Sequence, residues 1–192
     1  MFQTAPVVKK LLLLNIGLFI LQLILKYFSM SLVGLLALFP TNSSYYEPHQ
    51  IITHQFVHAG WLHLILNMFA LATIAPVVEE KIGSKKFILY YLFCGIGAGL
   101  LHLYFLTVNM PMVGASGAIY GMLLYFTFIK PNEKVFILFI PIGIKAKYLI
   151  PILLLVEIIL ATNGSNDGVG HWAHIGGAIT GTVLYLLNRE NK

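Results

Sequence analysis

Long runs of apolar residues that do not alternate with polar ones recur along this 192-residue chain. Lipid offers the backbone no hydrogen-bond partners, so a chain that crosses a bilayer must be helical or form a closed barrel. Barrel strands alternate apolar and polar residues, which these runs do not. With 58% hydrophobic and 10% charged residues, the chain is also too apolar for a water-soluble domain of this length. The sequence therefore predicts an all-α, polytopic membrane protein.

Six segments are candidate membrane spans. Most reach the ~17 to 20 residues that a helix needs to cross about 30 Å of hydrocarbon at about 1.5 Å per residue. The fifth is short. Residues 135–144 could lengthen it, although Lys145 and Lys147 interrupt that path and would have to extend to the interface. The predicted spans cover residues 11–28, 61–78, 87–106, 113–129, 148–161 and 171–187.

The basic residues predict how the spans are oriented. If six spans alternate across the membrane, eleven basic residues fall on one side and only Lys26 falls on the other. The positive-inside rule makes the first side cytoplasmic and places both termini there. The net charge of +5 thus marks topology and does not call for a nucleic-acid partner. The eleven residues are Lys9, Lys10, Lys81, Lys85, Lys86, Lys130, Lys134, Lys145, Lys147, Arg189 and Lys192.

A single membrane domain is predicted over residues 1–192, because no second domain, strong internal repeat or low-complexity linker is visible. No small-residue cleavage site follows Phe28, so the first apolar run is expected to be a retained span. The connection 29–60 is rich in Leu, Tyr, Phe and His and is expected to lie in the interface. Cys94 is the single cysteine, excludes an intrachain disulfide and is expected to be a small core residue.

Two residues with catalytic potential lie near the outer ends of the fourth and sixth spans. The run Gly114-Ala115-Ser116-Gly117 places a hydroxyl between glycines about one helical turn below the outer surface. Alone this run is weak evidence, because small residues in membrane helices more often serve packing. His174 lies at a similar depth, since both spans run in the same direction. A neutral imidazole there could take the serine proton and return it to a leaving amine.

Further polar and small residues are expected at the same depth. His63 and Asn67, at i and i+4 in the second span, share one face and could join the Ser116 amide in an oxyanion hole. Alone, a pair of this kind more often joins helices. Tyr120 follows Ser116 by one turn and could stack on the histidine ring. A pair of glycines below His174 would let the sixth span approach its neighbour closely; they are Gly177 and Gly181.

With these residues in this order along nearly the whole chain, the sequence resembles the rhomboid intramembrane proteases. It resembles their minimal form, which has six helices. The resemblance implies Ser116 as nucleophile, His174 as general base, and His63 and Asn67 around the oxyanion. It also implies a dyad without a carboxylate, no cofactor, and Glu79 as a structural acid. The motifs are His58 with Ala59-Gly60, His63-Leu64-Ile65-Leu66-Asn67, Glu79-Glu80-Lys81-Ile82-Gly83-Ser84, Gly114-Ala115-Ser116-Gly117 with Tyr120, and Ala173-His174-Ile175-Gly176-Gly177 with Gly181.

The implied activity is hydrolysis of a peptide bond at or near the outer end of a client's transmembrane helix. The implied partners are single-span membrane proteins and membrane lipid. The short length and the lack of a transit peptide favour a bacterial plasma membrane. Family members commonly carry Trp-Arg where this chain has His49-Gln50, which puts the anchoring of the long loop in doubt.

Two acids could in principle serve as a third group that orients His174, and both rank below the dyad. Asp167 is expected to be a solvated turn residue, in a run with Asn163, Gly164, Ser165 and Asn166. Glu157 lies within the fifth span and is expected to pair inside the bundle or to turn toward the interface.

Three other functions remain open from the sequence. Histidines could bind a metal, but there is no HExxH motif and no acidic residue stands among them in sequence; they are His54, His58, His63, His171 and His174. A rhomboid-like protein that binds clients without cutting them typically lacks the serine or the histidine, and both are present here. A transporter is disfavoured because no inverted repeat is visible and the polar cluster lies near one surface.

Overall fold

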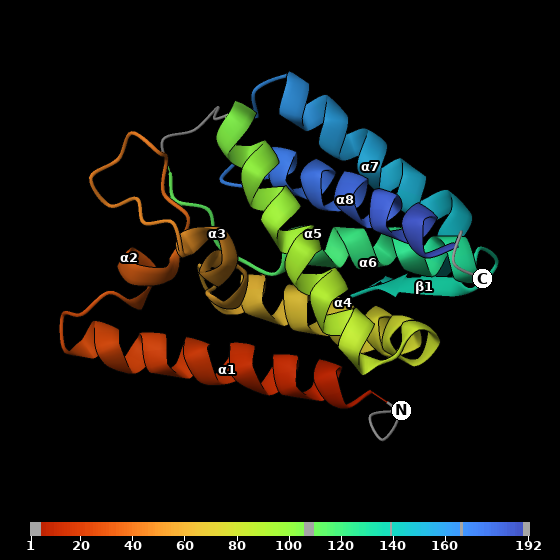
Figure 1. Cartoon of the computed structure of the whole chain (residues 1–192), viewed down its shortest axis with the longest axis horizontal. Coiled ribbons are helices and arrows are strands. Elements are labelled where there is room, and N and C mark those ends of the chain that lie inside the picture. The colour runs from red at the N-terminus through yellow and green to blue at the C-terminus, as the bar shows by residue number, and fades with distance from the viewer. Residues whose placement is uncertain (1–4, 106–109, 139, 166, 190–192) are drawn as a thin grey trace.

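The computed structural model describes residues 5–105, 110–138, 140–165 and 167–189, and in these residues it is a helical bundle with one small hairpin (Figure 1). The predicted all-α membrane fold is confirmed. The helices are α1 (Pro6–Tyr27), α2 (Leu32–Leu36), α3 (Gln50–Thr53), the 3-10 helix η1 (His54–Phe56), α4 (Trp61–Ile82), α5 (Ser84–Phe105), α6 (Ser116–Ile129), α7 (Ala146–Thr162) and α8 (His171–Arg189), and the strands are β1 (Lys134–Ile137) and β2 (Ile140–Lys145).

Each predicted span corresponds to one of the six long helices in the described part of the chain. Among them α1, α4 and α5, of 22 residues each, are long and apolar enough to cross a membrane, and α6 is a shorter apolar helix. The last residue of the third predicted span, Leu106, lies outside the described residues, as do Asn166 and Lys192. Gly83 joins α4 to α5 with a φ of 80°, a left-handed conformation that favours glycine.

Two predicted boundaries were wrong. The fourth span does not begin at residue 113, because Met112 pairs with Leu38 in a β-bridge and Gly114 takes a φ of 113°. Ser116 is therefore the first residue of α6 and is not one turn inside it. Residues 135–144 do not lengthen the fifth span either. They form the antiparallel hairpin β1–β2, in which Val135 pairs with Ile144, as β-branched residues favour.

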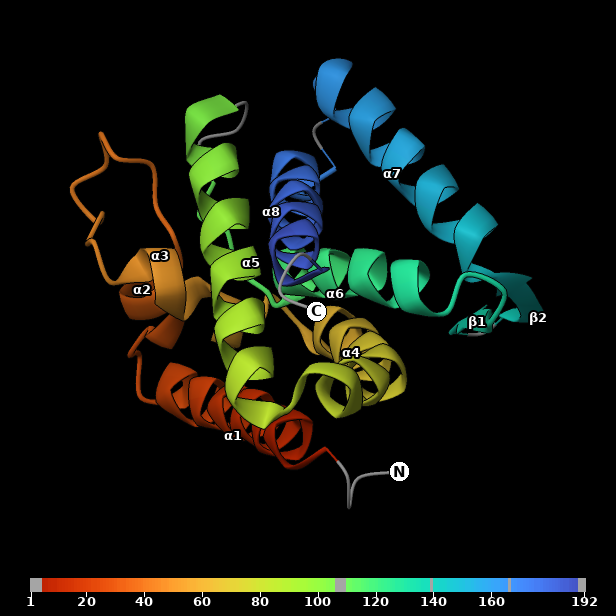
Figure 2. The ribbon, with the colours of Figure 1, turned by 45° about the vertical axis from the view of Figure 1, so that its right-hand side comes forward.

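Helix α8 lies at the centre of the bundle, against α5, α6 and α7 (Figure 2). Gly177 packs so closely on α6 that an added Cβ would overlap the carbonyl of Gly117. An added Cβ at Gly181 would lie 2.6 Å from the Cα of Gly121. The Tyr90 hydroxyl bridges this contact, 3.0 Å from the Gly121 oxygen and 2.8 Å from the Gly181 oxygen. The predicted close approach along the glycine pair is confirmed.

Glu79 ties the first helix to the rest of the bundle. Its two carboxylate oxygens accept the backbone N–H groups of Val7, at 3.0 Å, and Val8, at 2.8 Å. These amides belong to the first turn of α1, where a helix cannot satisfy them itself. The Ser84 hydroxyl donates to the same carboxylate at 2.6 Å. Glu79 therefore holds the starts of α1 and α5 at the end of α4, the structural place that the family resemblance implies.

Candidate active site

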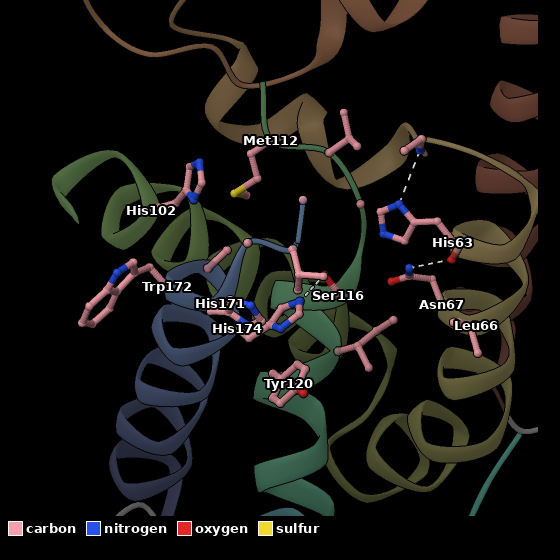
Figure 3. A pocket seen from close by; sticks show the side chains of 18 of the residues that line it. His63, Leu66, Asn67, His102, Met112, Ser116, Tyr120, His171, Trp172 and His174 are labelled. Atoms are coloured by element: carbon pink, nitrogen blue, oxygen red, sulfur yellow. Dashed lines mark hydrogen bonds between the residues drawn. The ribbon is translucent and has the colours of Figure 1, made fainter. Parts of the chain in front are cut away.

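A cavity of about 740 Å³ lies between the N-terminal ends of α4, α6 and α8 (Figure 3). Its wall is largely apolar, with residues such as Leu66, Met112 and Trp172, and a few polar side chains enter it. Ser116 and His174 are among these, as are His63 and Asn67. The structure thus brings the predicted site residues of three separate helices to one cavity.

Ser116 and His174 are in direct contact. The imidazole Nε2 lies 2.8 Å from the serine Oγ, within hydrogen-bond distance. His174 is 9% exposed, so its ring has little freedom to leave this contact. The Tyr120 ring stacks on the imidazole with centroids 4.4 Å apart and an interplanar angle of 13°. A phenol ring in this place fixes the plane of the imidazole and excludes water from one of its faces.

The position of Ser116 follows from the chain just before it. The left-handed Gly114 turns the backbone out of its pairing with the long loop and into α6. A helix whose first residue is the serine presents its unpaired first-turn N–H groups and the positive end of its dipole beside the Oγ. The hydroxyl and the amide of Ser116 therefore sit at the one place in α6 where a developing negative charge is favoured.

His63 and Asn67 approach the same cavity from α4 (Figure 3). The His63 Nδ1 accepts the N–H of Ala59 at 3.4 Å, so its proton resides on Nε2. An added Cβ on Gly114 would lie 2.6 Å from this Nε2, which shows how closely the ring packs against the turn. One amide hydrogen of Asn67 binds the His63 carbonyl at 2.8 Å. His63 and Asn67 each keep an N–H group that can donate into the cavity.

Glu157 on α7 joins this cluster, although the sequence ranked it below the dyad as a partner of His174. Its Oε1 accepts the Tyr120 hydroxyl at 2.6 Å, and its Oε2 lies 2.6 Å from Nδ1 of His171. Nδ1 of His174 lies 3.0 Å from Oε1, at ion-pair distance but without the alignment of a hydrogen bond. Glu157 thus pairs inside the bundle, which was one of its two expected places. An acid within an apolar span is a functional candidate by default, and that was the available signal.

Asp167 occupies the turn position that was expected of it. Its Oδ1 accepts the N–H of Val169 at 2.9 Å, and this backbone hydrogen bond lowers the pKa of the carboxyl. The carboxylate also lies 3.2 Å from Nε2 of His171. Among the described residues, Asp167 therefore contacts His171 and not His174 itself.

Comparisons with known proteins show the family of this chain. A family model described as the Rhomboid domain matches residues 45–191. The chain belongs to the rhomboid family. It is 30% identical to Rhomboid-like protein 11, chloroplastic, of Arabidopsis thaliana, over 92% of this chain and 63% of that protein. It is also 30% identical to the Putative rhomboid protease YdcA of Bacillus subtilis, over 74% and 68% of the two chains.

A third relative is the Rhomboid protease GluP of Bacillus subtilis, which is 31% identical over 69% of this chain and 24% of that protein. This rhomboid thus spans less than two thirds of the length of several relatives that it matches. Together with the apolar helices, the family membership makes it an integral membrane protein.

In this rhomboid an acid does stand among the histidines in space, contrary to the expectation from sequence order. Ligand atoms of Glu157, His171 and His174 all lie within 4.8 Å of one another. Two ligands on one tetrahedral zinc ion, however, are about 3.4 Å apart at bond lengths of about 2.1 Å. The 2.6 Å between Nδ1 of His171 and Oε2 of Glu157 is shorter than that and fits a shared proton. In the described structure, Glu157 is hydrogen-bonded to His171 and lies at ion-pair distance from His174.

Within the long loop, Gln50 and His49 make hydrogen bonds to the backbone. The buried Gln50 accepts the N–H of Phe39 at 3.2 Å and donates to the Tyr45 carbonyl at 2.9 Å. The His49 Nε2 lies 3.0 Å from the Leu35 carbonyl oxygen. These hydrogen bonds all join residues of the loop 29–60 to one another.

Proposed function

We propose that this rhomboid is an intramembrane serine endopeptidase that hydrolyses a peptide bond at or near the outer end of a client's transmembrane helix. The observation that carries the proposal is the 2.8 Å contact between the Ser116 hydroxyl and Nε2 of His174 at the cavity. Relatives named as rhomboid proteases support it. Serine is a poor nucleophile alone, and an adjacent imidazole is the common means of activating it.

The proposed reaction begins when Nε2 of His174 takes the proton of Ser116 while Oγ bonds to the client carbonyl carbon. The oxyanion that forms accepts hydrogen bonds from the Ser116 amide and from the side chains of His63 and Asn67. Each such donor contributes about 3 kcal/mol of transition-state stabilisation. His174 then returns the proton to the leaving amine, and the acyl-enzyme is hydrolysed by water with the same imidazole as base.

The clients in this proposal are single-span membrane proteins. The client helix must first unwind locally, because a helical backbone hides the carbonyl that Ser116 attacks. Helix-weakening residues near the cleavage site favour that step.

The basic residues at one end of the helices support a topology with both termini in the cytoplasm. The Lys86 ammonium at the start of α5 donates to Oδ1 of Asn188 at the end of α8, at 3.4 Å. Glu79 brings the start of α1 to the end of α4. These helix ends therefore lie on the same side of the bundle. We extend the proposal to a bacterial plasma membrane.

The test is cleavage of a model single-span client by purified protein in detergent. Wild type is expected to cleave it, and Ser116→Ala and His174→Ala are each expected to lower the rate by at least about 10²-fold, as removal of a nucleophile or base does. A chelator should leave the wild-type rate unchanged. Cleavage that survives Ser116→Ala would contradict the serine mechanism. No cleavage of several clients by folded wild type would favour a client-binding protein that does not cut.

A further inference from the structure

The buried carboxylate of Glu157 is the feature that the proposed dyad leaves unused. Glu157 is 8% exposed on a helix whose neighbouring residues Val156 and Ile158 are each 45% exposed. A single acid on an apolar helix is costly to bury unless its oxygens receive hydrogen bonds or face a positive charge. Here both oxygens point into the bundle, toward the cavity side that holds His174.

Two neighbours hold the carboxylate in place. The Tyr120 hydroxyl donates to Oε1 and Nδ1 of His171 approaches Oε2, both at 2.6 Å. Distances this short are typical of charge-assisted hydrogen bonds. The Tyr120 ring also stacks on His174, so one side chain fixes both the carboxylate and the imidazole plane. The acid and the ring are thereby oriented relative to each other by a common support.

The remaining neighbour of Oε1 is His174 itself. Its Nδ1 lies 3.0 Å from this oxygen while its Nε2 lies 2.8 Å from Ser116. A carboxylate at Nδ1 favours the tautomer with the proton on Nδ1, which leaves the lone pair of Nε2 free for the serine proton. The contact is at ion-pair distance, without the alignment of a hydrogen bond. His174 thus has an acid on one nitrogen and the serine on the other.

We propose that Glu157 is a positioning residue for His174, so that Ser116, His174 and Glu157 work as a triad supplied by three helices. This inference rests on the proposed protease function. When Nε2 takes the Ser116 proton and the Oγ–carbon bond forms, the imidazole gains a positive charge that faces the Glu157 carboxylate. Nδ1 keeps its own proton, and the proton on Nε2 passes to the leaving amine. The carboxylate orients the ring and stabilises the imidazolium without being protonated.

Other titratable groups surround His174 and bear on any pH profile. Only Glu157 has a carboxylate within ion-pair distance of the ring among the residues that the structure describes. The groups that face the ring are His63 from α4, His102 from α5, Tyr120 from α6, Glu157 from α7, and His171 from α8 with Asp167 behind it.

The experiment compares wild type with Glu157→Gln, which keeps the shape and removes the charge. We expect kcat to fall about tenfold to a hundredfold, less than the ~10² to 10⁴-fold that a general base contributes, because His174 itself remains, with KM changed less than about threefold. Because the carboxylate favours the imidazolium, the midpoint of the acidic limb of kcat/KM should move to lower pH in the variant. Glu157→Asp keeps the charge on a shorter side chain. It should recover part of kcat and return the midpoint of the acidic limb of kcat/KM toward its wild-type value.

Two matched controls separate this effect from general damage. Glu80→Gln removes an exposed carboxylate from the far end of α4, and Val156→Ala changes an exposed neighbour on α7. Both should keep wild-type kinetics. Thermal unfolding of every variant in detergent is measured alongside.

The outcomes distinguish this inference from the proposed function. If wild type shows no cleavage that depends on Ser116, the proposed function fails. If wild type cleaves and Glu157→Gln keeps its kcat and its acidic limb, the function stands and the positioning role is wrong. A lower kcat with an unmoved acidic limb would assign Glu157 a purely structural role and would also overturn the inference.

Discussion

Gly114 shows how much of the site depends on one backbone conformation. Its φ of 113° turns the chain into α6, and the absence of a side chain there leaves room for the His63 ring. The sequence identified Gly114 as a flanking glycine that permits close approach, and that much is visible in the structure. The start of α6 at Ser116 could not be predicted, because it depends on the pairing of Met112 with Leu38, which are 74 residues apart.

Replacing Gly114 by alanine should damage both fold and chemistry. The new Cβ would be strained at this φ and would lie 2.6 Å from Nε2 of His63, so we expect a loss of about 1 to 3 kcal/mol in unfolding free energy. Cleavage should fall as His63 is displaced. Thermal unfolding and client cleavage in detergent measure the two effects.

The control for this change is Gly60→Ala, since Gly60 has an extended φ of −177° and, apart from its chain neighbours, no described residue has an atom within 4 Å of the position that an added Cβ would take there. Gly60→Ala should leave the thermal unfolding and the rate of client cleavage near the wild-type values. Equal effects of the two substitutions would contradict the role assigned to the turn.

At the scale of elements, the helices were predicted far better than the details of their ends. Apolar runs long enough to span a bilayer leave few alternatives, so the six long helices of the described residues were all predicted. The hairpin β1–β2 was missed because residues 135–144 are as apolar as a span, and only Pro141 and Gly143 mark them as different. The partners of Glu157 could not be predicted for another reason: Tyr120 and His171 come from α6 and α8, and their convergence is a property of helix packing.

The packing of α8 on α6 gives a prediction at this scale. An alanine at Gly177 would overlap the Gly117 carbonyl and push the helices apart, so we expect about 1 to 3 kcal/mol of destabilisation, as overpacking causes. Because His174 lies one turn away on the same helix, cleavage should fall as well. Unfolding temperature and cleavage rate are the measurements.

Gly17→Ala on α1 is the matched control, because, apart from the nearby backbone of α1 itself, no described residue has an atom within 4 Å of the position of an added Cβ there. It should be neutral or slightly stabilising, since alanine is the better helix former. A tolerated Gly177→Ala, with unfolding temperature and rate unchanged, would show that the close contact is not needed.

The whole molecule should lose stability as the pH is lowered. Burial lowers the pKa of His58 from 6.5 to about 3, so the folded state keeps the imidazole neutral where the unfolded chain has already bound a proton. Stability is therefore complete above about pH 6.5 and declines as the pH falls toward 3. At about pH 5 the loss is about 2 kcal/mol from this residue alone.

Unfolding temperature between about pH 7 and pH 4.5 measures this dependence. His58→Asn should show a shallower decline than wild type, whereas the exposed His49→Asn should decline as wild type does. Parallel curves for wild type and His58→Asn would rule out His58 as a source of the acid sensitivity.

Helix α7 lies at the edge of the bundle, against α6 and α8 (Figure 2), and Glu157 bonds it to both. Any outward swing of α7 would withdraw the carboxylate from His174 in the same movement. The position of α7 and the orientation of His174 are therefore coupled through a single side chain.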